Sequence, residues 1–490
     1  MSALGFRPLA TRSGRRTASR ACTFLTAALV AACAGATATP TTLPTAAPAP
    51  TAAPTPTAAP TAAPTAAPSP TAAPTTPAAV VPFELAMGKT PLLVPAGDDG
   101  VKAGTAINDF GFDLLRRLDS SGNLCVSPSS IALALAMVQP GARGATATEM
   151  DSVLHGLGSD ANASEIVALL AKLQADTVYA DADGYPLEPD QTPTPGQAPL
   201  AELTVSNQAF VQKGLTLQAA YLEALSSRFG AGVGLLDFAA DAESARLTIN
   251  KWASDRTHGR IPNVLQPGDV DPATRLALAN AIYLNAAWQD PFDPAKTASR
   301  AFKRADGSTV KVPTMAAELL ATYSSGPGWR AIKLPYVDAM SMIVVVPDQM
   351  SSFIAGANAA AFSKIASKLT SGYMVDFTMP RFSTESRLSL GDLLAAMGMA
   401  SAFDPAKADL SGIDGSPDIV LDKVIHQANI DVVEEGTTAS AVTVVGGRGM
   451  GLPPPPVTFH VDRPFLYFIQ DSASGAILFM GRIDDPSAGA

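Results

Sequence analysis

The sequence predicts an α+β domain built around large mixed sheets. Helix-like periodicity is concentrated in the first part of the folded region, whereas strand-like runs dominate the later part. The two patterns do not alternate regularly, as they would in a barrel of βα units. The chain has 490 residues, 47% hydrophobic and 16% charged. Residues 85–485 alone are therefore long enough to bury a large core.

The first 32 residues have the features of a targeting segment. Arginines precede a short apolar run at 23–32, which is too short to span a bilayer as a permanent helix. The run ends in Leu-Val-Ala-Ala-Cys33, which resembles the bacterial lipoprotein cleavage motif, in which the cysteine becomes lipidated. We expect a signal peptide over 1–32 and a lipid anchor on Cys33, with plain secretory cleavage as the alternative. Both place the product outside the cytoplasm, either extracellular or at the cell surface.

Residues 33–82 form a separate, low-complexity segment. Residues 34–82 contain no charged side chain and repeat Pro-Thr-Ala-Ala-Pro units, so they have almost no bulky apolar surface to bury. Their prolines favour extended polyproline conformations. This composition predicts a disordered, semi-rigid linker that holds a domain over 83–490 away from a surface; the threonines also permit glycosylation.

Within the domain, periodicity predicts the elements one by one. Apolar residues recur at helical spacing in 104–118, and 131–138 is apolar all round, which indicates a helix buried at the centre. Further helices are predicted over 165–173, 216–229 and 242–257. Short β-branched and aromatic runs predict strands over 203–211, 276–284, 331–334, 340–346, 373–379, 430–433, 457–459, 465–469 and 476–480.

Composition excludes several classes of function. The formal net charge of −10, without runs of Lys or Arg, argues against a nucleic-acid partner. Within residues 83–490 the only cysteine is Cys125, which we interpret as an inert core thiol. The four histidines are not paired at a metal-ligand spacing, so we expect neither a metal nor another cofactor.

No arrangement of residues predicts an enzyme. The Gly-x-Ser-x-Gly elbow of esterases does not occur. Ser308 and Lys311 match the Ser-x-x-Lys element of penicillin-recognising enzymes, but the companion elements precede it, in the reverse of the required order. The adjacent Glu434 and Glu435 lie in a strand pattern and would point to opposite faces, which does not suit paired acid and base chemistry.

The segment from Asp431 to Pro456 combines two incompatible patterns. From 436 to 447 the side chains are small or β-branched and uncharged, which suits a strand added to an existing sheet. From 446 to 456 glycines and four consecutive prolines exclude a central strand. This segment alone would also fit an ordinary edge strand that continues into a flexible loop.

Nine short motifs that follow one another along residues 100–485 resemble the serpins, a family of serine protease inhibitors that act by a covalent trap. Each motif alone is weak, but their common order is specific. They lie at 123–131, 204–210, 249–252, 258–261, 278–284, 379–382, 409–413, 461–469 and 479–481.

The resemblance implies a single, metastable domain with three β-sheets, about nine helices and an exposed reactive-centre loop. In such a protein the protease attacks a bond in the loop and forms an acyl-enzyme, after which the loop inserts into the main sheet as a new strand. The chain is thus identified as a suicide-substrate inhibitor and not an enzyme, and as a secreted or lipid-anchored bacterial member. We expect a monomer that contacts a membrane only through its lipid.

The resemblance also assigns roles to individual residues. The hinge of the loop would comprise Glu434, Glu435, Gly436, Thr437, Thr438, Ala439, Ser440, Ala441 and Val442. Positions 437, 439, 441, 443 and 445 share one parity and would face the same side of the sheet after insertion. Ser127, Ser130, Asn280 and His426 match the buried polar cluster under the opening point of the sheet, called the shutter. Trp288 matches the tryptophan at the top of the sheet, called the breach; its plain alternative is a core aromatic residue.

The resemblance places the reactive bond a fixed distance beyond the hinge. Counting sixteen residues from Glu434 gives Met450-Gly451, which would be bait for a chymotrypsin-, elastase- or subtilisin-like protease. Arg448-Gly449 is the rival and would be bait for a trypsin-like protease, and the bond after Leu452 is a third candidate. Two other functions stay open: a non-inhibitory binding protein with the same fold, and a secreted serine hydrolase.

Overall fold

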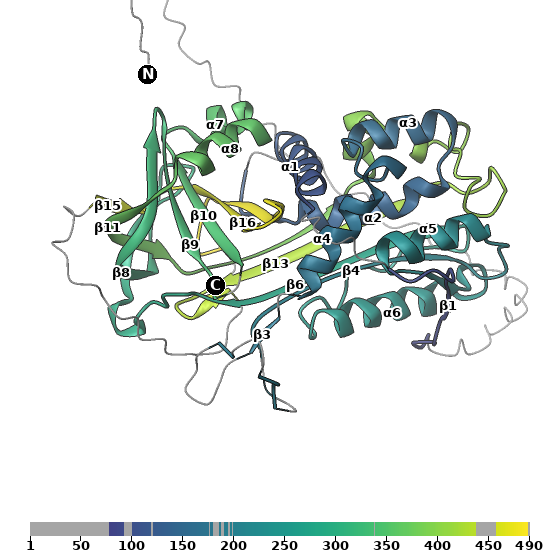
Figure 1. Cartoon of the computed structure of the whole chain (residues 1–490), viewed down its shortest axis with the longest axis horizontal. Helices are drawn as coiled ribbons and strands as arrows, with labels where there is room; N and C mark the ends of the chain where they lie inside the picture. The colour runs from purple at the N-terminus through teal and green to yellow at the C-terminus, as the bar shows by residue number, and fades with distance from the viewer. Residues whose placement is uncertain are drawn as a thin grey trace, which may run out of the picture. The chain divides into compact units, whose positions relative to one another are not determined.

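The computed structural model describes residues 78–92, 100–118, 121–175, 177–179, 186–187, 191–194, 197, 199–337, 339–437 and 457–488. Nine α-helices occur among these residues (Figure 1). They are α1 Val101–Leu115, α2 Pro128–Val138, α3 Gly144–Val153, α4 Ala163–Ala175, α5 Ala219–Phe229, α6 Phe238–Arg256, α7 Met350–Gly356, α8 Ala359–Lys368 and α9 Gly391–Leu394. None of the described helices is both long enough and apolar enough to cross a bilayer.

The main sheet has eight strands in the order β1-β5-β4-β6-β14-β13-β12, with β3 also paired to β4. Its strands are β1 Glu84–Ala86, β3 Val178–Tyr179, β4 Pro199–Gln212, β5 Val233–Leu236, β6 Leu276–Ala287, β12 Phe382–Ser389, β13 Lys423–Val432 and β14 Gly436–Thr437. The centre of the sheet is the long antiparallel pair of β4 and β6.

The other strands form one nine-stranded hydrogen-bonded network, in the order β15-β11-β8-β9-β10-β16-β17-β2 with β7 paired to β8. They are β2 Leu124–Val126, β7 Ala298–Lys303, β8 Thr309–Gly326, β9 Trp329–Pro335, β10 Met340–Pro347, β11 Thr370–Pro380, β15 Val457–His460, β16 Phe465–Asp471 and β17 Ile477–Ile483. The start of β8 pairs with β7, its middle pairs with β11, and its end pairs with β9. The predicted second and third sheets therefore share this strand and form a continuous network.

Helix α2 is buried along its whole length beneath the main sheet. The Ser127 hydroxyl caps its N-terminus by accepting a hydrogen bond from the Ser130 amide (3.2 Å), and Pro128 occupies the first turn, where no amide donor is needed. Only small and aliphatic side chains follow, which lets a helix lie among apolar neighbours on every side.

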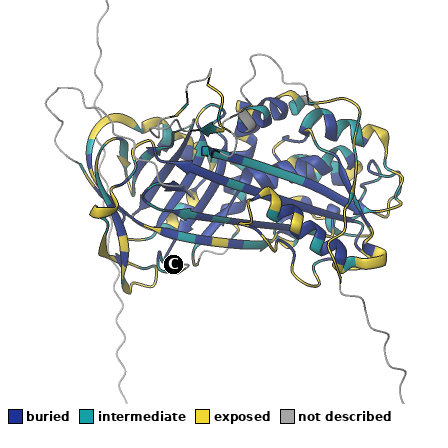
Figure 2. Ribbon diagram, turned by 90° about the horizontal axis from the view of Figure 1, so that it is seen from below, coloured by how far each residue is buried: buried dark blue, intermediate teal, exposed yellow. Residues whose placement is uncertain are grey.

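Strand β6 separates two cores because its side chains alternate between the faces of the sheet. Leu278, Ile282 and Leu284 face the large core that contains α2. Ala277, Ala279 and Ala281 face a smaller core beneath α6. The strands of the sheet are mostly buried, and exposed residues gather in the connections (Figure 2). Such an alternation requires a strand buried on both faces, which matches the apolar run predicted at 276–284.

The packed chain starts earlier than the domain boundary predicted at residue 83. The amides of Ala79 and Val81 already donate hydrogen bonds to Ser244 and Thr248 on α6, at 3.2 and 2.9 Å. The last residues assigned to the linker are therefore part of the folded unit. Composition concealed this because Pro82 and its alanine-rich surroundings resemble the linker.

Candidate functional site: the opening point of the main sheet

The main sheet contains a seam between β6 and β13. These strands are parallel neighbours only at one end, where 423–426 pair with 277–280. Towards the other end they diverge, and the two residues of β14 lie in the gap, where Thr437 pairs with Ala286 on β6 and with Val432 on β13. The sheet thus already holds the first two residues of a strand that is antiparallel to both neighbours.

The two halves of the seam are in the same register. Where β6 and β13 are direct neighbours, His426 pairs with Asn280. Where they are apart, Thr437 lies between them and pairs with both Val432 and Ala286. The partner numbers differ by 146 in both places. An extension of β14 along the seam therefore requires no register slip in either neighbour, and a slip would turn every inserted side chain to the wrong face.

Two of the four predicted shutter residues, His426 and Asn280, meet through their side chains below this seam, and Ser127 joins them through its backbone amide. His426 Nδ1 donates to Asn280 Oδ1 (3.0 Å), and His426 Nε2 accepts from the Ser127 amide (3.1 Å). Because Nε2 accepts, the imidazole is neutral in this arrangement. Burial lowers the pKa of His426 to about 3. The cluster is therefore an uncharged polar bridge across the closed seam.

The fourth residue, Ser130, takes part through its backbone. Its carbonyl accepts from Asn280 Nδ2 (2.6 Å) and its amide caps α2, whereas its buried hydroxyl has no hydrogen-bond partner among the described residues. The cluster also contains two residues that the sequence analysis missed. Asn207 on β4 accepts from Asn280, and the hydroxyls of Ser129 and Ser127 lie 3.2 Å apart.

The hinge is anchored by a buried carboxylate. The Glu434 side chain is 1% exposed; it lies 2.6 Å from Arg381 Nε and accepts a hydrogen bond from the Thr297 hydroxyl. Burial by itself raises the pKa of Glu434, but these two partners outweigh it and hold the pKa below its ordinary value. The Glu434 carbonyl accepts from the Phe292 amide at 2.9 Å. The predicted neighbour Glu435 contributes its carbonyl, which accepts from the Trp288 amide (2.9 Å).

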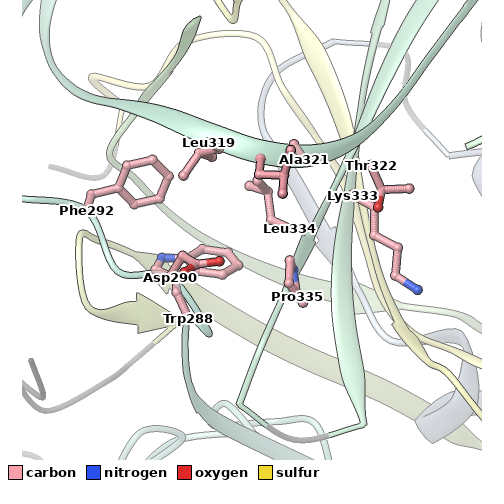
Figure 3. A pocket seen from close by; sticks show the side chains of 10 residues that line it. Trp288, Asp290, Phe292, Leu319, Ala321, Thr322, Lys333, Leu334 and Pro335 are labelled. Atoms are coloured by element: carbon pink, nitrogen blue, oxygen red, sulfur yellow. The ribbon is translucent and has the colours of Figure 1, made fainter. Parts of the chain in front are cut away.

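Trp288 closes the top of the seam. Its ring stacks on Tyr336 with centroids 4.5 Å apart, and its indole nitrogen donates to the Val433 carbonyl (3.0 Å). The Tyr336 hydroxyl is hydrogen-bonded to the hydroxyl of Thr437 in β14, at 2.6 Å from Thr437 Oγ1. Thr437 is 1% exposed and faces the large core, so odd-numbered positions of a strand continued from it would face inward. A cavity of about 70 Å³ borders Trp288, Phe292 and Leu334 beneath β8 (Figure 3).

Gly436 is required here by close approach. A Cβ atom at this position would lie 2.2 Å from the Ala286 carbonyl oxygen. The Val433 amide donates to the Gly436 carbonyl (2.9 Å), and the Gly436 amide donates back (3.2 Å), which closes the turn from β13 into β14. The sequence analysis assigned Gly436 backbone freedom for a swinging segment; in this structure its immediate role is to let β14 fit against β6.

Several predicted residues lie outside the described part of the chain. These are Thr438, Ala439, Ser440, Ala441 and Val442 of the hinge, the candidate reactive bonds (Met450-Gly451, Arg448-Gly449 and the bond after Leu452) and Cys33. Residues missed at the top of the seam are Arg381, Thr297 and Tyr336. Arg381 was part of a family motif at 379–382 but received no role, because no local pattern indicates that it pairs with Glu434. In the described part of the chain no cluster of His, Cys, Asp or Glu could hold a metal ion.

Known proteins resemble this chain over most of its described residues. The family model described as "Serpin (serine protease inhibitor)" matches residues 105–486. The chain is 34% identical to the leukocyte elastase inhibitor of Xenopus tropicalis over 394 residues, which cover 78% of this chain and 99% of that protein. It is 33% identical to human Serpin B8 over 387 residues, which cover 76% and 96%.

Solved structures show the same fold. The native thermophilic serpin tengpin has a TM-score of 0.70 at 24% identity and covers 83% of this chain and 100% of its own. Native protease nexin-1, crystallised with heparin, has a TM-score of 0.66 at 26% identity, with 79% and 100% coverage. The predicted fold and the family resemblance are confirmed: the chain belongs to the serpin family of serine protease inhibitors.

Proposed function

We propose that this serpin inhibits a chymotrypsin- or elastase-type serine protease by inserting its reactive-centre loop along the seam between β6 and β13. The observation that carries the proposal is β14, which occupies the start of the seam in the register that the rest of the seam requires. A loop that only bound a partner would not need this match. The protein would act once and is not expected to turn over substrates.

Insertion converts solvent-exposed loop backbone into paired strand. Each new hydrogen bond between neighbouring strands contributes about 1 kcal/mol net, and the inserted strand would form such bonds with both β6 and β13. If the inserted strand continues in the register of Thr437, positions 439, 441, 443 and 445 would lie on the inward face with it. All four are small or β-branched and uncharged, so they can enter the core without an unpaired charge. The native form, in which the loop has not inserted, must then be held by a kinetic barrier.

The target class is proposed from the bait sequence and from relatives. Met450 offers an apolar side chain to the primary pocket of a protease, and relatives about one-third identical carry the name leukocyte elastase inhibitor. Arg448 is the competing bait and would select a trypsin-like enzyme. Both bonds precede β15, so a cut at either one would release the hinge side of the loop.

The decisive experiment is incubation of the full chain with a panel of serine proteases, followed by a denaturing gel and intact mass measurement. The expected result is an SDS-stable adduct with one protease, together with a new terminus at 451 or 449. Clean cleavage with the protease still active would instead identify a non-inhibitory member of the fold. Ester turnover in the absence of protease would support the hydrolase alternative and contradict the trap.

We also propose an extracellular, membrane-tethered location for a monomeric protein. The basis is sequence alone: the targeting segment at 1–32, the cysteine at position 33 and the uncharged linker that follows. Incorporation of a labelled fatty acid into the wild-type protein but not into Cys33→Ser tests the anchor. Release of an unlipidated product by both proteins would favour plain secretion, and light scattering of the purified protein tests the monomer.

A further inference from the structure

A short segment crosses the open part of the seam. Residues 257–261, here called the strap, follow the end of α6. The Thr257 hydroxyl donates to the Ala253 carbonyl on α6 (2.8 Å) and accepts from the Ile261 amide (3.0 Å), which ties both ends of the strap to the helix. His258 and Gly259 have positive φ angles of 48° and 80°, so the helix cannot continue and the chain turns.

On one side of the seam the strap contacts β4 and β6 through His258. Nε2 of this histidine lies 3.2 Å from Glu202 Oε1 on β4, and its ring centroid lies 4.7 Å from that of Tyr283 on β6. The Thr204 hydroxyl donates to the same Glu202 oxygen (3.4 Å). Thr204 is the direct partner of Tyr283 in the sheet, so the three side chains form one polar group beneath the imidazole.

On the other side of the seam the strap contacts β13 through Arg260. Its Nη1 lies 2.8 Å from Asp431 Oδ2, and its carbonyl accepts from the Asn429 side chain (3.1 Å). The Ser383 hydroxyl on β12 donates to the other Asp431 oxygen and so fixes this carboxylate. His258 and Arg260 are only two residues apart. Through two carboxylates they link β4 and β6 to β13.

The strap lies where the loop would enter. In the register of β14, residue 438 of a continued strand falls between 285 and 431, and residue 440 falls between Tyr283 and Asn429. Positions 438 and 440 share the parity of these neighbours, so their side chains would point toward the strap. Further along, entry must part β6 from β13 by one inter-strand spacing, about 4.8 Å. The strap must therefore lift, and at least one of its two carboxylate contacts must break.

The two contacts differ in their response to pH. An arginine stays charged, so the pair of Arg260 and Asp431 persists in mild acid. Histidine is the side chain whose charge ordinarily changes between pH 5 and 8. The titratable and charged groups that face His258 are Glu202 from β4, Tyr283 from β6 and Arg260 from the strap itself.

Glu202 is the partner that a protonated imidazole would meet. Burial, and then the charge of Glu202, raise the pKa of Tyr283, so its phenol stays neutral in this range. Arg260 is engaged by Asp431. The Glu202 carboxylate, 3.2 Å from His258 Nε2, is therefore the charge to which the contact responds.

We propose that the strap is a pH-sensitive restraint on loop insertion: protonation of His258 completes an ion pair with Glu202 and so fastens both sides of the seam. The inference rests on the proposed function, because a restraint matters only if the loop inserts. The native form keeps the pair, whereas the state in which the loop enters has lost it. Mild acid therefore stabilises the native form relative to that state and slows insertion.

The test measures how fast the full chain takes up a fluorescent synthetic peptide with the sequence of residues 438–450, at pH 5.5 and at pH 8.0. Wild type should take up the peptide about two- to fourfold more slowly at pH 5.5, the range expected for one partly exposed ion pair. His258→Gln and Glu202→Gln should each remove this difference. The double variant should add nothing further, because both changes remove the same contact.

His155→Gln is the matched control, because His155 also lies near a carboxylate, 3.0 Å from Asp113 on α1, and should keep the wild-type ratio of the two rates. Arg260→Gln removes the contact that does not titrate and should speed uptake at both pH values. A ratio that is the same in wild type and His258→Gln overturns the proposal. So does a ratio that Glu202→Gln leaves unchanged, or uptake that Arg260→Gln leaves unchanged.

Failure of the restraint and failure of the proposed function give different results. If the loop does not insert, wild type takes up no peptide and gives no SDS-stable adduct at either pH. If only the restraint is wrong, wild type does both, and every histidine and glutamate variant keeps the wild-type pH ratio. Hydrogen exchange of amides 257–261, corrected for intrinsic rates, tests the strap without insertion: in wild type, but not in His258→Gln, protection should rise in mild acid.

Discussion

The imidazole of His426 donates to the carboxamide of Asn280 across the seam at which β6 and β13 would part, with Nδ1 3.0 Å from Oδ1. This bond links the two halves of the main sheet through uncharged groups only. The cost of opening therefore depends on the protonation of one buried histidine, because an imidazolium cannot accept the Ser127 amide through Nε2.

We predict that acid destabilises the native form through His426. The pKa of this histidine is about 3 in the folded protein and about 6.5 in an unfolded chain, so between these values only the unfolded chain binds the proton. Stability contributed by the neutral form is fully present above pH 6.5. It decreases by up to about 1.4 kcal/mol per pH unit as the pH falls towards 3.

The measurement is the thermal midpoint of the native form at pH 6.5 and pH 5, where few carboxylates titrate. His426→Gln should lower the midpoint at pH 6.5 but reduce its fall on acidification. His155→Gln removes an exposed histidine that lies 3.0 Å from Asp113, and it should leave the fall of the midpoint on acidification close to that of wild type. An equal fall in all three proteins would contradict the assignment to His426.

A charge at Thr437 should convert the inhibitor into a substrate. Thr437 is buried, faces the large core and lies 2.6 Å from the Tyr336 hydroxyl, so Thr437→Arg would bury an unpaired guanidinium whenever β14 lies in the seam, in the native form as well as in the inserted one, and would hold the start of the loop out of the sheet. The expected result is cleavage of the loop with little adduct, measured as moles of inhibitor consumed per mole of protease. Thr437→Ser keeps the hydroxyl and should stay near the wild-type ratio. An unchanged ratio for Thr437→Arg would refute insertion along this seam.

The register makes a sharper prediction for Thr443. Continued from Thr437, an inserted strand places Thr443 between Asn280 and His426, the two residues whose mutual hydrogen bond it must replace. Thr443→Val keeps the volume but leaves these buried groups short of a partner, a cost of about 1–3 kcal/mol. The thermal midpoint of the loop-cleaved form should fall while that of the intact form is unchanged. Thr438→Val, at the opposite parity, is the control; an equal fall in both variants would exclude the register.

The sequence predicted the order of the elements well because most of them are long and strongly periodic. Helices 104–118 and 216–229 and strands 276–284 and 340–346 correspond to α1, α5, β6 and β10. Strand β8 was missed because its two ends serve different sheets, so exposed and buried side chains do not alternate consistently along it. Helices α7 and α8 were missed because each is short and rich in Ala and Ser.

The site was predictable only in part, for a related reason. Ser127, Asn280, His426 and Trp288 were singled out by the family resemblance, whereas no local pattern marks Arg381, Asn207 or Tyr336. Their roles depend on contacts between residues far apart in the chain, such as the 53 positions that separate Arg381 from Glu434. The packing of residues 79–92 against the domain was hidden because its contacts use backbone amides and two apolar rings within a proline-rich context.

The ion pair of Glu434 and Arg381 should set how firmly the hinge is held. Glu434 is buried while the Arg381 side chain is 43% exposed, so solvent screens the pair and Arg381→Leu should cost about 1–2 kcal/mol, less than a fully buried pair. Because the pKa of Glu434 is held below its ordinary value, the stability from this pair is present at neutral pH and lost as the pH falls below about 4.5. Glu434→Gln keeps the hydrogen-bonding shape and should remove that acid-dependent part of the stability.

The fluorescence of Trp288, which lies against the hinge, reports release of the hinge at neutral pH. An Arg381→Leu variant with the wild-type spectrum and thermal midpoint would show that the backbone contacts of Trp288 and Phe292 hold the hinge unaided.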